Sequence, residues 1–129
     1  MSERRALQVV VVLASLIPIC AGAAGTLLGP AMVEVAGAPI AADSHYRYLS
    51  GLLLAIGIAF ATTIPRIETR TARFRLLTAI VVCGGLGRLL SLLLCGWPDK
   101  PMVAALVMEL VVTPALAIWQ GRIASQAQR

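Results

Sequence analysis

Four apolar stretches occupy most of this 129-residue chain. A helix needs about 20 residues to cross a bilayer and about 17 at the short limit, and the second stretch reaches that limit only with its polar prefix "DSHYR". Within hydrocarbon every backbone polar group must be bonded inside its own segment, which favours helices. The sequence therefore predicts an all-α, polytopic membrane protein, a four-transmembrane-helix bundle with spans at about 6–28, 44–64, 74–96 and 101–121.

Composition supports a single membrane domain over residues 1–129. The chain is 59% hydrophobic and 13% charged, whereas a soluble domain carries about 25% charged residues. The net charge is +5, but the basic residues lie between apolar segments instead of on one polar face, so nucleic acid is not an expected partner. Cys20, Cys83 and Cys95 form no CxxC pair, and neither a disulfide framework, a metal site nor a cofactor is predicted.

The distribution of charge predicts how the chain is threaded. Arginines cluster at the amino end, in the connection 65–73 and at the carboxyl end, whereas the connection 29–43 carries Glu34 and Asp43 and no basic residue. The positive-inside rule then places both termini and 65–73 in the cytoplasm of a bacterium, with the spans in its inner membrane. The outer loop 29–43 lies along the interface or dips back as a lid. The first span also has the layout of a signal peptide, but its apolar run is longer than is usual.

Two ionisable residues interrupt the apolar stretches. Arg88 lies in the third span and Glu109 in the fourth, and a charge at a helix centre costs about 2.5–3.5 kcal/mol on insertion scales. Arg88 lies eight residues before the expected helix end near Gly96. Glu109 lies eight residues after the expected helix start near Pro101, across the short "PDK" connection. Both are therefore about 12 Å below the outer helix ends at the usual helical rise. Because helices joined by so short a loop are antiparallel neighbours, the sequence predicts an intramembrane ion pair between Arg88 and Glu109.

Other polar side chains are expected at similar depth. The predicted ligand-binding residues are Arg88, Glu109, Arg47, His45, Tyr46, Ser50 and Ser91. An excess of arginine there suits an anionic or amphipathic ligand. The alternative is a buried ion pair that only fixes helix register.

Small residues and prolines predict how the helices pack. Three spans each carry a stripe of small residues at helical spacing, which lets membrane helices approach closely. The glycines of these stripes are Gly22 in the first span, Gly51 in the second, and Gly84 and Gly87 in the third. Pro18 and Pro114 are expected to interrupt their helices, and the Thr113 hydroxyl could bond a freed carbonyl.

The motifs "DSHYRYLSGLLLAIGI", "IPRIE", "GGLGRLLSL" and "ELVVTPALAIWQ" make the chain resemble the bacterial domain-of-unknown-function family 4345. That family consists of four-helix membrane proteins similar in layout to the DoxX-like group. The resemblance implies a fold and no activity. The residues of this chain that it selects as characteristic of the family are Tyr46, Arg47, Gly51, Arg88 and Glu109.

Three classes of function follow. The first is a small membrane protein that binds an amphipathic or anionic ligand in an outward-facing polar pocket. The second is an accessory or structural subunit of a larger membrane complex or homo-oligomer. The third is an enzyme on a lipid-soluble substrate, with Glu109 and His45 as acid and base. The third fits least, because no nucleophile, phosphate-loop or metal motif is present. A Glu beside an Arg should also be ionised, which suits pairing better than acid catalysis.

Overall fold

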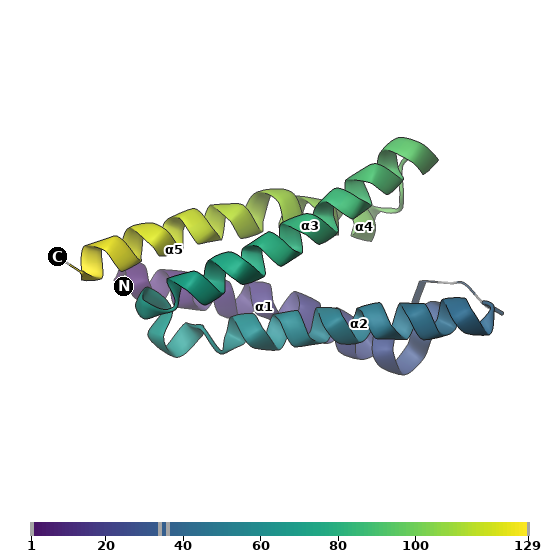
Figure 1. Cartoon of the computed structure of the whole chain (residues 1–129), viewed down its shortest axis with the longest axis horizontal. Coiled ribbons are helices and arrows are strands. Elements are labelled where there is room, and N and C mark those ends of the chain that lie inside the picture. The colour runs from purple at the N-terminus through teal and green to yellow at the C-terminus, as the bar shows by residue number, and fades with distance from the viewer. Residues whose placement is uncertain (1, 34, 36, 129) are drawn as a thin grey trace. The chain divides into compact units, whose positions relative to one another are not determined.

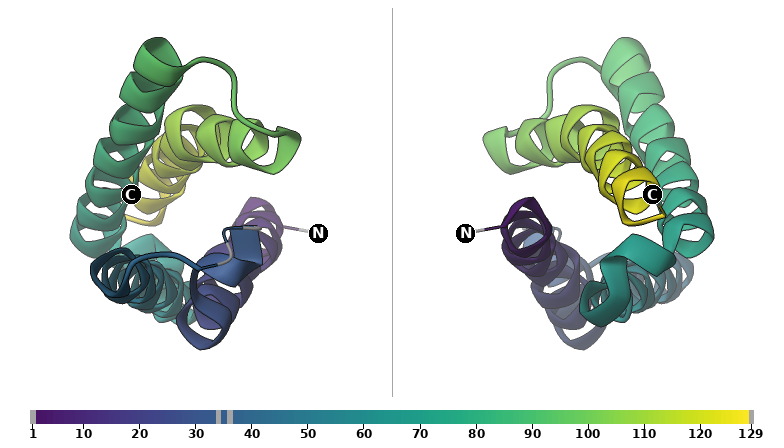
Figure 2. Two further views of the ribbon diagram at one scale, coloured as in Figure 1. Left: turned by 90° about the vertical axis from the view of Figure 1, so that its right-hand side faces the viewer. Right: turned by 90° about the vertical axis from the view of Figure 1, so that its left-hand side faces the viewer.

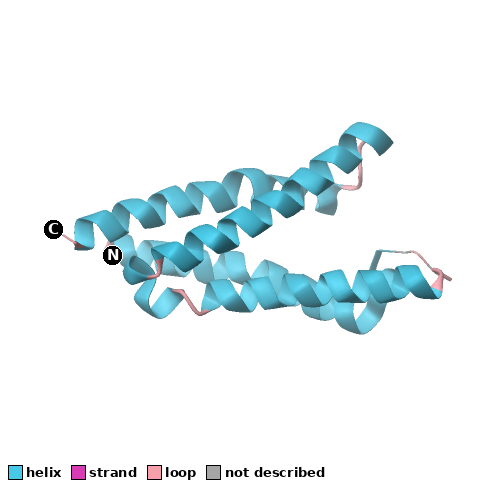
Figure 3. Ribbon diagram, viewed as in Figure 1, coloured by secondary structure: helices cyan, strands magenta, loops and turns pink. Residues whose placement is uncertain are grey.

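The computed structural model describes residues 2–33, 35 and 37–128, and Glu34 of the predicted outer loop lies outside these residues. Helices account for nearly all of the described chain, and it contains no strand (Figure 3). The expectation of an all-α fold is therefore confirmed. The α-helices are α1 (Glu3–Leu28), α2 (Ile40–Ala61), α3 (Thr71–Cys95), α4 (Lys100–Val107) and α5 (Thr113–Ala127), with shorter helical turns η1 (Gly29–Val33), η2 (Ile64–Thr69) and η3 (Met108–Val112) between them.

Three helical segments are long and apolar enough to cross a membrane. They are Glu3–Val33, Thr71–Cys95 and Lys100–Ala127. Helix α2 is not among them, because its first two turns carry Asp43, His45 and Arg47 and lower its mean hydropathy. The sequence predicted four such spans, and in the described residues the structure supports three.

Helix α2 also begins earlier than residue 44, where the second span was expected. Pro39 precedes its first turn, and the Pro39 carbonyl accepts a hydrogen bond from the Asp43 backbone N–H at 3.0 Å. Asp43 lies in this first turn, where a negative charge complements the positive end of the helix dipole. Part of the predicted loop 29–43 is therefore helical.

The chain divides into two compact units. The α3–α5 unit comprises Met1–Leu7 and Pro65–Arg129, and the α1–α2 unit comprises Gln8–Ile64. Within the first unit, α3 packs against α5 and η3 (Figure 1). A short link carries the chain from α3 to α4 (Figure 2). From there α4, η3 and α5 follow one another without a break.

The α3–α5 unit is held at one end by a buried polar side chain. Gln120 of α5 is fully buried, and its Nε2 donates to the Ile67 carbonyl at 2.7 Å and to Thr71 Oγ1 at 2.9 Å. Phe74 and Leu116 are among the buried apolar residues of the same unit. Gln120 therefore joins the middle of α5 to η2 and the start of α3.

In the α1–α2 unit, glycines allow the two helix backbones to touch. A Cβ at Gly22 would lie 2.7 Å from Leu54 Cα, and one at Gly57 would lie 2.7 Å from Ile19 Cγ1. A Cβ at Gly51, which the sequence placed in a packing face, would be in ordinary van der Waals contact with Thr26 Oγ1 at 3.9 Å, so this position has room for a methyl group. Helix α1 runs through Pro18 as a single helix, so the expected interruption there is not seen.

This packing predicts different outcomes for two glycine substitutions in one unit. Gly22→Ala should lower the free energy of unfolding by about 1–3 kcal/mol, because the new methyl group overlaps the α2 backbone. Gly51→Ala should be neutral or gain about 0.5–1 kcal/mol, since alanine is the better helix former. Reversible unfolding in mixed micelles, followed by circular dichroism, measures both. Equal effects would contradict the contact at Gly22.

Candidate functional site

An ion pair joins α3 to η3 in the α3–α5 unit. Arg88 Nε donates to Glu109 Oε1 at 3.0 Å. The Glu109 side chain is 16% exposed and that of Arg88 is 37% exposed. The carboxylate is thus the enclosed partner, and the guanidinium is the accessible one.

The pair leaves hydrogen-bonding capacity unused. Glu109 Oε2 is shielded from solvent and has no hydrogen-bond partner among the described residues. Arg88 Nη1 donates to Met102 Sδ at 3.1 Å, and Nη2 makes no hydrogen bond with the described residues. A buried acceptor without a partner costs about 1–3 kcal/mol. The site therefore retains one acceptor on Glu109 and one donor group on Arg88.

Gly85 brings the two charged residues together. A Cβ at Gly85 would lie 2.9 Å from Glu109 Cβ and 2.7 Å from Leu110 Cδ2, so the π-helical turn rests directly against this bare position of α3. Arg88 follows one helical turn later on α3. The glycines that the sequence placed at this contact, Gly84 and Gly87, would meet no atom within 4 Å.

The turn that carries Glu109 is π-helical, and its cause lies just after it. Pro114 has no N–H to continue the α-helical ladder. The Thr113 backbone N–H and Oγ1 both donate to the Met108 carbonyl, Oγ1 at 2.8 Å, which is the hydroxyl contact expected from the sequence. The π-helical form itself was not predicted. Such turns occur frequently at functional sites.

Arg47 has a set of contacts of its own in the α1–α2 unit. Its Nη1 donates to the carbonyls of Thr26 at 2.8 Å and Leu27 at 2.9 Å, and its Nε donates to Asp43 Oδ2 at 2.8 Å. A cation at the last carbonyls of a helix complements the helix dipole. Arg47 thus caps the carboxyl end of α1, and its predicted role toward a ligand stays a prediction.

The remaining predicted site residues differ in exposure. Ser50 is buried and Tyr46 is half-buried, and both lie close to Gly25, whose Cβ would come within 3.4 Å of Tyr46 Cε1. His45 is exposed on the same helix, and Ser91 is exposed on α3. Arg88, Ser91 and Glu109 belong to one unit and the other four residues to the other. The single pocket predicted from all seven stays a prediction.

Helices of membrane-crossing length and one enclosed ion pair define the class: a small helical protein whose segments are suited to a bilayer. Residues 6–120 match the model of the family described as a domain of unknown function (DUF4345), so the chain belongs to that family. This confirms the family resemblance seen in the sequence. No curated protein and no solved structure matches the chain.

The contact at Gly85 predicts a local change on substitution. Gly85→Ala should push η3 away from α3 and expose the backbone of residues 108–112, so that their amide hydrogens exchange faster. Gly84→Ala adds the same methyl group one residue earlier, where it meets no neighbour, and should leave exchange unchanged. Hydrogen exchange with peptide mass spectrometry in detergent measures both. Slow exchange at 108–112 in both variants would show that Gly85 does not set the position of Glu109.

Proposed function

We propose that this protein is a small integral inner-membrane protein that binds a small amphipathic ligand at Arg88 and Glu109. The observation that carries the proposal is the shielded Glu109 Oε2, for which the part of the chain that the structure describes offers no hydrogen-bond partner. A ligand that donates to this oxygen would remove the cost of leaving it unpaired. Ionisable residues within membrane segments are functional candidates by default.

The proposed topology has four spans, with both termini and 65–73 in the cytoplasm of a bacterial cell. The three segments of membrane-crossing character support it, as do the arginines of 65–73. The apolar part of α2, residues 48–61, would complete the fourth span with the polar turns before it at the outer surface. Arg88 and Glu109 then lie in the outer half of the bundle, and the site opens outward.

The charge balance favours an uncharged head group over an anionic one. The sequence alone suggested an excess of arginine. In the structure Arg88 pairs with Glu109, and Arg47 pairs with Asp43 at 2.8 Å. Neither pair carries a net charge, so nothing in these contacts offsets the cost of desolvating an anion.

A hydroxyl group matches the free positions of the Arg88–Glu109 pair. It can donate its proton to Glu109 Oε2 and accept from Arg88 Nη2, whereas a ketone or ether could only accept. The Arg88 side chain is the more exposed partner, which gives such a ligand a route to the pair. We therefore infer a lipid-soluble molecule with a hydroxyl-bearing head group.

Substitution of the acceptor tests this function. The protein would be purified from native membranes in mild detergent and examined by native mass spectrometry. A bound small molecule of one mass is expected in the wild type. Glu109→Gln should lower its occupancy about tenfold or more, because the amide that replaces the carboxylate is a much weaker acceptor for a charge-assisted hydrogen bond.

Glu68→Gln is the matched control, because Glu68 pairs with Arg4 at 2.8 Å in the same unit and away from the site. Its occupancy should stay at the wild-type level. Equal occupancy in Glu109→Gln and the wild type would show that the ligand binds elsewhere. An empty protein that migrates with a larger assembly would instead favour the accessory-subunit alternative, with Arg88 and Glu109 fixing helix register.

The topology has a separate test. A fluorescent protein fused to the carboxyl terminus should fluoresce, because that end is cytoplasmic. A phosphatase fused after Asp99 should be active, since the connection between α3 and α4 lies outside. Activity of a phosphatase at the carboxyl terminus would overturn the four-span arrangement.

A further inference from the structure

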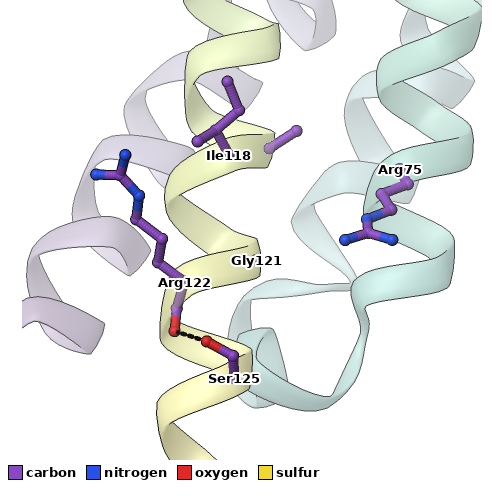
Figure 4. A pocket seen from close by; sticks show the side chains of 6 residues that line it. Arg75, Ile118, Gly121, Arg122 and Ser125 are labelled. Carbon is purple, nitrogen blue, oxygen red and sulfur yellow. Dashed lines mark hydrogen bonds between the residues drawn. The ribbon is translucent and has the colours of Figure 1, made fainter.

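A pocket opens on the α3–α5 unit, and nothing described above makes use of it. Its volume is about 400 Å³. One wall comes from α3 and the rest from the last turns of α5 (Figure 4). The residues that line it are Arg75, Ala117, Ile118, Gly121, Arg122 and Ser125.

Two arginines without a counter-charge line the pocket, and the Arg122 side chain extends away from Arg75 (Figure 4). Arg75 reaches from α3 toward α5, and its Nη2 would lie 3.8 Å from a Cβ at Gly121 (Figure 4). Arg75 and Arg122 are both exposed, and their side chains make no hydrogen bond or ion pair with the described residues. Arg75 and Arg122 therefore differ from Arg4, Arg47 and Arg88, each of which pairs with an acid.

The rest of the lining is apolar or already bonded. Ile118 is 62% exposed and lies with Ala117 one turn before Arg122 on α5. The Ser125 hydroxyl donates to the Arg122 carbonyl at 2.8 Å, so the guanidinium groups are the hydrogen-bond donors that the pocket offers. The pocket thus combines a cationic rim with an apolar wall.

The pocket lies at one end of this unit. Arg75 is in the second turn of α3, and Arg122 is near the end of α5. The Gln120–Thr71 hydrogen bond holds the start of α3 against the middle of α5, two residues before Arg122. Both helices belong to segments of membrane-crossing length, so their shared end is where lipid head groups would be.

We propose that this pocket binds the head group of an anionic phospholipid. The lipid phosphate would accept hydrogen bonds from the Arg75 guanidinium, which suits phosphate geometry. The exposed Arg122 side chain, which extends away from Arg75 (Figure 4), would turn toward the same phosphate. An acyl chain would lie along Ile118. Basic pockets between membrane helices are known to take such head groups. The apolar wall is what favours a lipid over free phosphate, which would gain nothing from Ile118.

Native mass spectrometry of the purified protein in mild detergent tests the site. Phosphatidylglycerol, phosphatidylcholine and inorganic phosphate would be titrated in turn. Phosphatidylglycerol should bind in preference to the other two. The double variant Arg75→Gln/Arg122→Gln should weaken that binding about tenfold or more, because two charge-assisted contacts to phosphate are lost.

Arg5→Gln/Arg66→Gln is the matched control, since it removes the same charge from two exposed arginines of the same unit. It should change binding less than about twofold, as expected for screened surface charges. An equal loss in both double variants would reduce the pocket to part of a general basic surface. Equal binding of inorganic phosphate would identify free phosphate as the occupant and overturn the lipid.

This test is separable from that of the proposed function. Glu109→Gln should leave phosphatidylglycerol binding unchanged, because Glu109 is not in the pocket lining. Circular dichroism would show whether the double variant retains its helix content, and the single variants Arg75→Gln and Arg122→Gln should each show part of the loss. No loss in any of the three variants would overturn the site.

Discussion

The close approach of η3 to α3 at Gly85 is the contact on which the candidate site depends. A guanidinium and a carboxylate removed from water stabilise each other only if they meet with good geometry. The Arg88–Glu109 contact of 3.0 Å requires that the two backbones come closer than a side chain at Gly85 would allow. Pro114 and Thr113 contribute from the other side, because they open the turn that carries Glu109.

The two arginines selected from the sequence have become chemically different in the fold. Arg47 Nη1 donates to two carbonyls of α1, and its Nε donates to Asp43. It therefore has a complete structural role as a helix cap. Arg88 keeps Nη2 unused beside an acid with an unpaired oxygen. Both arginines leave Nη2 without a hydrogen bond to the described residues, but only Arg88 does so beside a carboxylate oxygen that is shielded and unpaired there.

The sequence predicts those features that depend on chain distance and charge. The length of the apolar stretches predicted the helices. The equal distances of Arg88 and Glu109 from the ends of helices joined by a short connection predicted that the two side chains would meet. Gly85 could not be chosen over Gly84 and Gly87 in the same way, because helical spacing does not say which face of α3 receives the neighbouring helix. The π-helical turn could not be predicted either, because a proline such as Pro114 is compatible with a kink, a break or a wide turn. The start of α2 was also missed, because its first turns are polar. A prediction from the length of apolar stretches does not show that a helix begins in polar residues.

Charge pairing follows a pattern in the α3–α5 unit that a bilayer would explain. The acid–base pair lies within apolar helical segments, where an isolated charge would be costly. The unpaired arginines, Arg75 and Arg122, lie where α3 begins and α5 ends, where water and head groups can solvate them. The Arg4–Glu68 pair also lies near the start of α3, and its arginine and glutamate side chains are more exposed than those of Arg88 and Glu109, respectively. Within the apolar segments of this unit the charged residues are therefore paired with each other, as a bilayer would favour.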